Sequence, residues 1–353
     1  MNVATRIDIP QRGRILVIAL RRLGDVLLTT PLIRSLRQSW PDTTIDALVF
    51  ADTAGILADN PDLNAVVTMP ARPTAVQSVA LAARLWRNYD LAISTQSGDR
   101  PTYFALLAGW RCIAPVEATL SGRFKRGLLH RSVPNDRRTH RVEQILRLAD
   151  ALGIARASDL VGPRARDVLG LPDGGYAVIH AAPLFRYKQW HKDGWRALAA
   201  WLVARGLAVV ATGGPGESER HYLDEVWQDA PVKRLDAQLD WPHLAGLLSK
   251  ARVYIGPDTS VTHLAAAVKC PTVAIYGPTD SRLWGPWPAG GLSTPWEAAR
   301  TRQRRGCVWL MQNPLPCMPC QLEGCERRQD SYSSCLDELP ADRVIAAVEE
   351  AIA

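Results

Sequence analysis

The sequence predicts an α/β protein made of two doubly wound domains, each a parallel sheet with helices on both faces. With 353 residues, the chain is long enough to bury two cores. Short apolar runs alternate with helical patterns in both halves, and the segment between the halves is rich in Gly and Pro. Apolar residues make up 47% of the chain and charged residues 22%, which is typical of a folded globular protein and excludes disorder.

The composition of successive segments predicts where the domains begin and end. We expect the first domain over residues 1–155, a linker over 156–175 and the second domain over 176–335. The second domain ends in a cysteine-rich tail, 307–335. A last amphipathic helix within 336–353 is expected to pack back against the first domain.

Apolar runs predict the strands, and apolar residues at helical spacing predict the helices. In the first half the expected strands are 15–20, 45–50, 65–69 and 91–94, and the expected helices are 27–39 and 76–88. In the second half the expected strands are 176–180, 208–212, 253–256 and 272–276, and the expected helices are 195–205, 218–227, 241–249, 261–268 and 343–352. Because ligands of such sheets bind outside the carboxyl ends of the strands, we expect the two domains to face each other across a cleft that holds the active site.

The sequence also indicates where the protein resides. The longest apolar stretch near the start, 15–20, is too short to span a bilayer and is flanked by arginines. We find neither a signal peptide nor a transmembrane helix, and therefore expect a cytoplasmic protein. Thiols stay reduced there, so the seven cysteines are not expected to form disulfides.

A cluster of basic residues lies between residues 123 and 141. Its members are Arg123, Lys125, Arg126, Arg131, Arg137, Arg138 and Arg141. Such a cluster attracts phosphates or an anionic membrane face, although a solvated loop has the same composition. Phe124 is its only aromatic residue and no nucleic-acid-binding motif accompanies it, so we expect no nucleic-acid partner.

Gly24 and Asp25 follow the first predicted strand, where the chain turns into a helix. Gly24 permits a tight turn, and Asp25 lies at the edge of the sheet where a ligand is expected. This position suits either a helix N-cap or a catalytic base. A single glycine is too few for the dinucleotide-binding fingerprint.

Three segments of the second half follow strands at one edge of the sheet. In the segment 256–263, backbone N–H groups and the hydroxyls of Thr259 and Ser260 suit a diphosphate, although a helix cap without a ligand has the same sequence. Lys188 can neutralise a leaving phosphate, and Glu217, after a glycine pair, can accept from a ribose hydroxyl or an adenine amine. Such residues are usually only solvated when they occur singly, so the convergence of three loops favours a ligand site.

Five motifs in this order resemble glycosyltransferase family 9, the ADP-heptose:lipopolysaccharide heptosyltransferases. They are Gly24-Asp25 with Thr29 and Pro31, Lys188-x-Trp190, Gly213-Gly214-Pro215, Asp258-Thr259-Ser260 with His263, Ala265 and Ala266, and Tyr276-Gly277-Pro278-Thr279. The segments 185–190 and 283–287 are most similar to the heptosyltransferase III branch. The resemblance covers nearly the whole chain.

The resemblance implies the GT-B architecture, with the acceptor on the first domain and ADP-heptose on the second. It implies an inverting, metal-independent transfer of heptose to a lipopolysaccharide core sugar, at the cytoplasmic face of the inner membrane. Asp25 would be the catalytic base. The implied donor-binding residues are Lys188, Gly213, Gly214, Glu217, Asp258, Thr259, Ser260 and His263. The basic residues expected to hold acceptor phosphates are Arg123, Lys125, Arg126, Arg137 and Arg138. One departure is that Ala181-Ala182-Pro183 stands where the family often has hydroxyl residues.

In the implied mechanism, Asp25 takes the proton of the acceptor hydroxyl as that oxygen attacks the anomeric carbon opposite ADP. Lys188 and the helix start at Thr259 stabilise the departing diphosphate. One alternative is a family member with another acceptor, such as a protein serine, or with another nucleotide sugar. A second is a two-domain solute-binding module that performs no chemistry.

The cysteine-rich tail predicts a structural zinc or iron site. Cys317 and Cys320 are separated by two residues, and Cys335 with either Cys307 or Cys325 completes four sulfur ligands. No histidine lies nearby and the spacing beyond Cys320 is not that of a standard zinc finger. Reduced thiols without a metal therefore stay the alternative.

Overall fold

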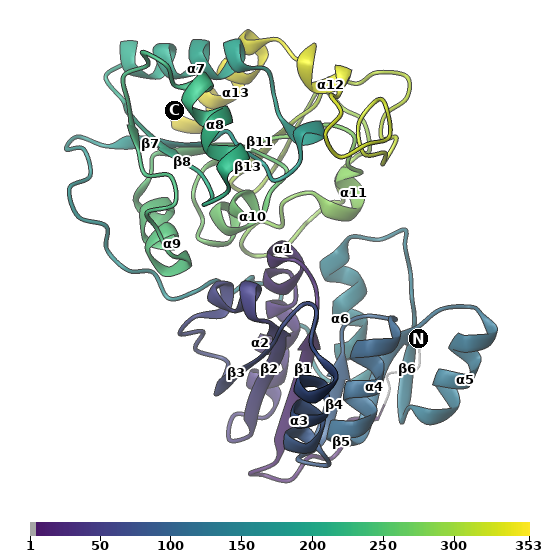
Figure 1. Ribbon diagram of the computed structural model, residues 1–353. Coiled ribbons are helices and arrows are strands. Elements are labelled where there is room, and N and C mark those ends of the chain that lie inside the picture. Colours follow the sequence, from purple (N-terminus) through teal and green to yellow (C-terminus); the bar gives the residue numbers. More distant parts are fainter. Residues whose placement is uncertain (1–4) are drawn as a thin grey trace. The chain divides into compact units, whose positions relative to one another are not determined.

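The computed structural model describes residues 5–353 as two compact units. The first unit runs through Arg164 and the second begins at Ala165, so the division falls inside the expected linker, 156–175. Each unit has its own sheet and its own core, as predicted (Figure 1).

The first unit contains six parallel strands in the order β3-β2-β1-β4-β5-β6. The strands are β1 (Arg14–Ala19), β2 (Thr44–Phe50), β3 (Ala65–Met69), β4 (Tyr89–Ser94), β5 (Gly109–Val116) and β6 (Arg131–Pro134). The helices are α1 (Leu23–Leu27), α2 (Thr30–Ser39), the 3-10 helix η1 (Ala51–Leu57), α3 (Ala75–Leu85), α4 (Asp99–Ala108), α5 (Leu120–Leu128) and α6 (Arg141–Leu152).

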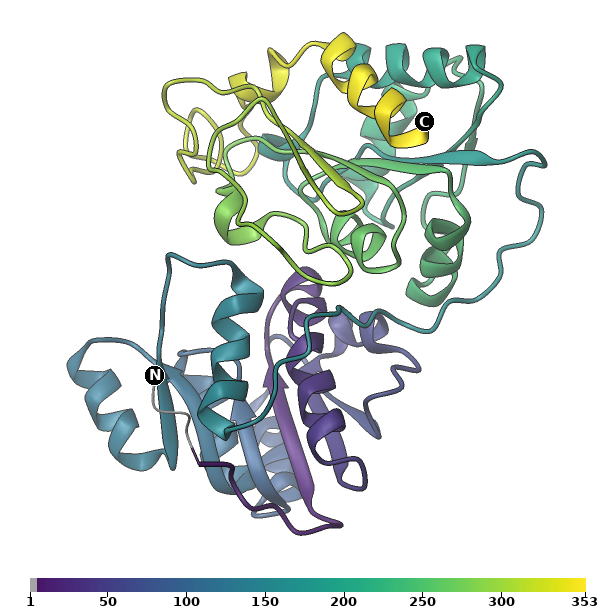
Figure 2. The same cartoon turned by 180° about the vertical axis from the view of Figure 1, so that it is seen from behind.

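Helices cover both faces of the first sheet, so its central strands are buried on both sides and form continuous apolar runs. On one face α2 and α6 lie against the sheet (Figure 2). Their residues Leu36 and Leu148 belong to the core on this side. On the other face Leu85 of α3 and Ala105 of α4 lie in a separate core. The helices α3, α4 and α5 share this second face, because each lies in a right-handed crossover that runs in the same direction along the sheet.

The second unit contains seven strands in the order β12-β13-β11-β10-β7-β8-β9, all parallel except β12. The strands are β7 (Tyr176–His180), β8 (Ala208–Thr212), β9 (Val232–Arg234), β10 (Val253–Pro257), β11 (Thr272–Ile275), β12 (Arg302–Arg305) and β13 (Val308–Met311). The helices are the 3-10 turn η2 (Arg186–Lys188), α7 (Lys192–Ala204), α8 (Glu217–Val226), α9 (Trp241–Lys250), α10 (Ser260–Ala267), α11 (Ser281–Trp284), α12 (Ser334–Asp337) and α13 (Ala341–Ile352).

The last helix corrects one expectation. We expected it to pack back against the first domain, but α13 buries Val344, Ala347 and Val348 in the core of the second unit, beside α7. Their spacing places these three apolar side chains on one side of the helix, and the adjacent face of the second sheet is apolar enough to cover them.

Three expected strands, 65–69, 176–180 and 208–212, have the observed bounds. The expected helix 27–39 is instead two helices, α1 and α2, separated at Leu28 and Thr29. Pro31 explains the division, because a proline lacks an N–H and clashes with the preceding turn, and is tolerated only at a helix start. Among residues 5–353, no helix is long and apolar enough to cross a membrane.

Candidate functional site

Asp25 lies in the first turn of α1, at the carboxyl end of β1. The N-cap of α1 is Arg22, so the alternative that Asp25 caps the helix is wrong. The Asp25 carboxylate instead accepts a hydrogen bond from Arg21 Nε at 3.2 Å. Arg141 Nε lies 3.7 Å from the same carboxylate oxygen. With its side chain only 11% exposed, Asp25 is fixed by two guanidinium groups at the edge where ligands of such sheets bind.

Arg141 is a site residue that the sequence placed only within the basic cluster. It begins α6, is buried, and donates from its guanidinium to the carbonyl oxygen of Thr95 at 2.8 Å. Burial lowers its pKa, while the charge of Asp25 acts in the opposite direction. Arg141 therefore links the end of β4 to the carboxylate of Asp25, a connection that spacing along the chain does not reveal.

The structure separates the five residues that we expected to hold acceptor phosphates. Arg123, Arg126 and Arg138 are exposed. Arg137 is exposed too, but it pairs with Glu117 at 2.9 Å. Lys125 is buried. Its ammonium donates to the carbonyl oxygen of Ser97 at 2.7 Å and pairs with Asp99 at 2.6 Å. These contacts give Lys125 a role in holding α5 to the sheet.

In the second unit, Lys188 and Asp258 form an ion pair at the carboxyl edge of the sheet. Lys188 Nζ lies 2.6 Å from Asp258 Oδ2, and the Thr279 hydroxyl donates to the same oxygen at 2.7 Å. Burial alone would raise the pKa of Asp258, but the charge and hydrogen bond of Lys188, with that of Thr279, lower it below its usual range. The cluster joins η2 to the segments that follow β10 and β11, whereas the loop after β8 has no residue in it.

The segment after β10 forms the start of α10. Thr259 is the N-cap, and its hydroxyl accepts from the backbone N–H of Thr262 at 3.4 Å. Ser260 is the first helical residue and is half-buried, and His263 is buried close to Asp258. The helix start therefore has its own cap, while its remaining N–H groups and the Ser260 hydroxyl suit an anion.

The loop after β8 contains Gly213 and Gly214, each with a side chain of α8 close to it. A side chain at position 213 would overlap Leu223, and one at 214 would overlap the carboxylate of Glu219. Glu219 accepts from the backbone N–H groups of Gly214 and Gly216, while burial is the larger effect and raises its pKa. Glu217, which we expected to contact the nucleoside, begins α8 and is exposed. Sequence reasoning missed Glu219, although an acid three residues after a helix N-cap is a known capping arrangement.

His180 is a second residue that the motifs did not indicate. It ends β7, and its Nδ1 lies 3.1 Å from the hydroxyl of Thr212 at the end of β8. Burial lowers its pKa to about 4, so the ring is neutral near pH 7. His180 thus places a neutral polar group beside Ala181-Ala182-Pro183, where the expected hydroxyl residues are absent.

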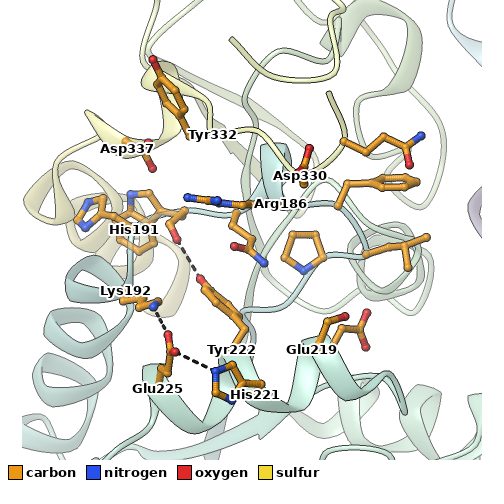
Figure 3. Close-up of a pocket in the computed structure, with 17 residues that line it drawn as sticks. Arg186, His191, Lys192, Glu219, His221, Tyr222, Glu225, Asp330, Tyr332 and Asp337 are labelled. Carbon is orange, nitrogen blue, oxygen red and sulfur yellow. Dashed lines mark hydrogen bonds and ion pairs between the residues drawn. The ribbon is translucent and has the colours of Figure 1, made fainter. Parts of the chain in front are cut away.

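A cavity of about 860 Å³ lies beside η2 in the second unit. Figure 3 shows Tyr222, Glu219 and Glu225 on α8 pointing toward it, opposite Arg186 and Asp330. Its walls are residues of the segment 183–192, one side of α8 from Ser218 to Glu225, and residues within 329–337. It shares the loop of Lys188 but is not lined by any of the donor-binding residues expected from the sequence.

The five tail cysteines divide into two groups. Cys307 precedes β13 and lies near Cys270, whereas Cys335 lies near Cys317, Cys320 and Cys325. All seven cysteines are reduced, and within residues 5–353 no three His, Cys, Asp or Glu side chains converge closely enough to hold a metal ion. This grouping favours Cys325, rather than Cys307, as the fourth thiol beside Cys317, Cys320 and Cys335.

Each unit by itself is a doubly wound sheet with polar groups gathered at its carboxyl edge, the arrangement of nucleotide- and sugar-nucleotide-binding α/β proteins. A family model described as glycosyltransferase family 9 (heptosyltransferase) matches residues 80–304. The chain belongs to this family. It is therefore a glycosyltransferase, and the alternative of a non-catalytic solute-binding module is wrong.

Individual relatives agree with this assignment. Lipopolysaccharide heptosyltransferase 3 of Escherichia coli (strain K12) is 32% identical over 296 residues, which cover 76% of this chain and 83% of the relative. Lipopolysaccharide heptosyltransferase 1 of Pseudomonas aeruginosa is 26% identical over 338 residues, covering 88% and 87%. The solved structure of E. coli heptosyltransferase WaaC with ADP is similar over 96% of this chain and 99% of that one, with a TM-score of 0.73 and 22% identity, which confirms the predicted GT-B class of fold.

Proposed function

We propose that this protein transfers heptose from ADP-heptose to a sugar of the lipopolysaccharide core, with inversion at the anomeric carbon. We choose these substrates because the chain is 32% identical to lipopolysaccharide heptosyltransferase 3 over most of both chains. A similar solved structure, that of E. coli heptosyltransferase WaaC with ADP-2-deoxy-2-fluoro heptose, supports a donor of this chemistry.

Asp25 is proposed as the general base. A base must have a carboxylate that is held in place yet open to the acceptor hydroxyl. The contacts with Arg21 and Arg141 supply the first requirement, and the position at the carboxyl end of β1 supplies the second. Both arginines keep a positive charge near the carboxylate, which also suits an acceptor that bears phosphates.

The donor is proposed to bind at the edge of the second sheet. The start of α10 would hold the diphosphate with Ser260 and backbone N–H groups, and Lys188 would stabilise the charge that develops on the leaving ADP. Gly213 and Gly214 let the chain approach a nucleoside closely, with Glu217 exposed beside them. This step uses a base and fixed positive charges, and we propose that it proceeds without a catalytic metal.

The acceptor is proposed to reach the first unit from the cytoplasmic face of the inner membrane, with which the protein associates peripherally. Arg123, Arg126 and Arg138 have the exposed guanidinium groups that phosphates of a lipopolysaccharide core would pair with.

The test combines one donor with several acceptors. The purified protein is incubated with ADP-heptose and a truncated lipopolysaccharide core, and we expect ADP release together with a gain of one heptose residue in the acceptor mass. Parallel reactions contain a serine-rich peptide as acceptor, or other nucleotide sugars as donors. Transfer only in one of these parallel reactions would replace the proposed substrates, and donor hydrolysis without transfer would contradict the function.

A further inference from the structure

The helix α5 has its apolar side turned away from the protein. Leu120, Phe124 and Leu128 are spaced four residues apart, so they form one row along the helix. They are 80%, 67% and 48% exposed, whereas the buried positions of α5 are Gly122 and Lys125. An ordinary surface helix has the reverse arrangement, with its apolar row on the core.

Two contacts fix α5 in this orientation. Gly122 lies so close to the backbone of Glu117 that any side chain would overlap the Glu117 carbonyl group. On the next turn, Lys125 reaches inward to Ser97 and Asp99. A rotation that buried Phe124 would break both contacts, so the exposed apolar row is part of the folded structure.

The neighbouring helices extend this surface. We use the term aromatic–arginine face for the exposed residues of α3, α4 and α5 and of the short segments on either side of these helices. Its exposed apolar and aromatic residues are Val76, Val79, Trp86, Tyr103, Trp110, Leu120, Phe124 and Leu128. Its exposed arginines are Arg72, Arg84, Arg87, Arg100, Arg123 and Arg126.

The charge of this face has a single sign. The sequence contains no acidic residue over 70–88 or over 118–135. In the remaining segment, 99–110, Asp99 is the only acid, and it is paired with Lys125. Arg87 stacks over the ring of Trp110, with 5.2 Å between the guanidinium carbon and the ring centroid. Guanidinium groups among exposed Trp, Tyr and Phe rings are typical of surfaces that lie in the interfacial region of a bilayer.

We propose that the aromatic–arginine face docks on an anionic phospholipid bilayer, with Leu120, Phe124 and Leu128 inserted among the headgroups. Charge complementarity favours lipid over a protein partner, because lipid phosphates match a face that has many cations and one neutralised acid. This proposal specifies which surface makes the peripheral membrane association stated above. It rests on the proposed function only for the identity of the membrane.

Vesicle co-sedimentation tests the proposal. We expect the wild-type protein to bind vesicles of phosphatidylethanolamine mixed with phosphatidylglycerol, to bind less as salt is added, and to bind vesicles of pure phosphatidylcholine weakly. The double variants Leu120→Ser/Phe124→Ser and Arg123→Gln/Arg126→Gln should each weaken binding roughly tenfold or more. Leu169→Ser/Arg220→Gln, which changes exposed residues of the second unit, is the matched control and should bind as wild type.

Two further measurements separate the possible outcomes. Thermal unfolding midpoints of all variants should equal that of the wild type, because the changed side chains are exposed. Transfer of heptose to a lipid-free core oligosaccharide by Leu120→Ser/Phe124→Ser should be unchanged. If the wild type does not transfer heptose to this oligosaccharide, only the proposed function is contradicted. The vesicle experiment then still decides whether the face docks on a bilayer.

The inference is overturned if the wild type does not sediment with anionic vesicles, or if both double variants sediment as the wild type does. It is also overturned if light scattering shows a dimer that Leu120→Ser/Phe124→Ser dissociates, since the apolar row would then be covered by a second copy of the chain.

Discussion

Asp25 is positioned by Arg21 and Arg141, and this predicts a kinetic defect for Asp25→Asn. The amide keeps the shape of the side chain but cannot take a proton, so turnover should fall roughly a hundredfold or more while the affinity for ADP-heptose stays nearly unchanged. Steady-state rates and calorimetry with the donor measure the two quantities. Asp52→Asn, at an exposed acid in the first turn of η1, is the control and should have normal turnover. Normal turnover in Asp25→Asn would remove Asp25 from the chemistry.

Two roles are predicted for Lys188, and a single and a double variant can separate them. Lys188→Met leaves the buried carboxylate of Asp258 without its cation, and should cost about 3 kcal/mol in the free energy of unfolding. Lys188→Met/Asp258→Asn removes both charges and should recover much of that loss. Both variants should bind ADP weakly and turn over slowly, because neither has a cation beside the leaving diphosphate. Wild-type affinity and rate in Lys188→Met would show that the pair is structural only.

The Lys188–Asp258 pair also has a defined dependence on pH. The pKa of Asp258 is lower in the folded protein than in the unfolded chain, where the pKa of an aspartate is about 3.9. The stabilisation is therefore complete above that value and is lost as the pH falls through the lower pKa of the folded state.

His180 makes stability depend on pH in a higher range. The unfolded chain binds this proton near pH 6.5, whereas the folded protein binds it only near pH 4, because burial opposes the charged ring. The unfolded state thus binds more protons between these values, so the free energy of unfolding should fall by roughly 3 kcal/mol as the pH drops from 6.5 to 4. Denaturant unfolding of His180→Gln should show a smaller pH dependence. His221→Gln, at a histidine that is 79% exposed, is the control and should match the wild type.

At the scale of elements, hydrogen bonds join parts of the cysteine-rich tail to one another. The backbone N–H of Ser334, which begins α12, donates to Cys325 Sγ at 3.4 Å, and the N–H of Cys325 donates to the Tyr332 carbonyl oxygen at 2.9 Å. Burial and the three neighbouring thiols raise the pKa of Cys335 to about 12. A metal ion would instead favour the thiolate form, since a coordinated thiol is deprotonated.

The structural metal of the tail stays a prediction, and the grouping of the thiols changes its expected fourth ligand from Cys307 to Cys325. Protein purified without a His-tag should contain about one zinc or iron per chain. Chelation, or the variant Cys320→Ser, should lower the thermal unfolding midpoint. Cys307→Ser should retain the metal. Less than about a tenth of an equivalent of either metal, with all thiols titrating freely, would contradict the prediction.

At the scale of the whole molecule, the division at Arg164 predicts that the nucleotide protects one unit only. Hydrogen exchange measured with and without ADP should slow in the second unit, near Lys188, in the loop 213–219 and at the start of α10. Residues of the first unit serve as the internal control and should exchange at the same rate in both samples. Equal protection of the segment around Asp25 would contradict the assignment of the donor to the second unit alone.

The sequence did not indicate the strands β5, β6, β9, β12 and β13. By itself it determined the alternation of strands and helices in two units, and the loops that follow several of the strands. These features depend on local patterns. Residues 177–179 of β7 are all apolar because both faces of this strand are buried, and Gly213 is a glycine because Leu223 leaves no room for a side chain. The family motifs lie in the same loops, so family membership could also be predicted.

Only the tertiary structure decided which of these residues meet. Arg141 reaches Asp25, and Thr279 joins Asp258, because the order of the strands brings the ends of distant segments together. No local pattern encodes that order. Contacts between elements also decide the orientation of α5. An apolar row along a helix usually lies on the core, but Lys125 bonds to Ser97 and Gly122 lies against the backbone of Glu117, so the apolar row of α5 is exposed. Side-chain spacing fixes which residues share a face of an element, whereas contacts between elements fix which face is buried.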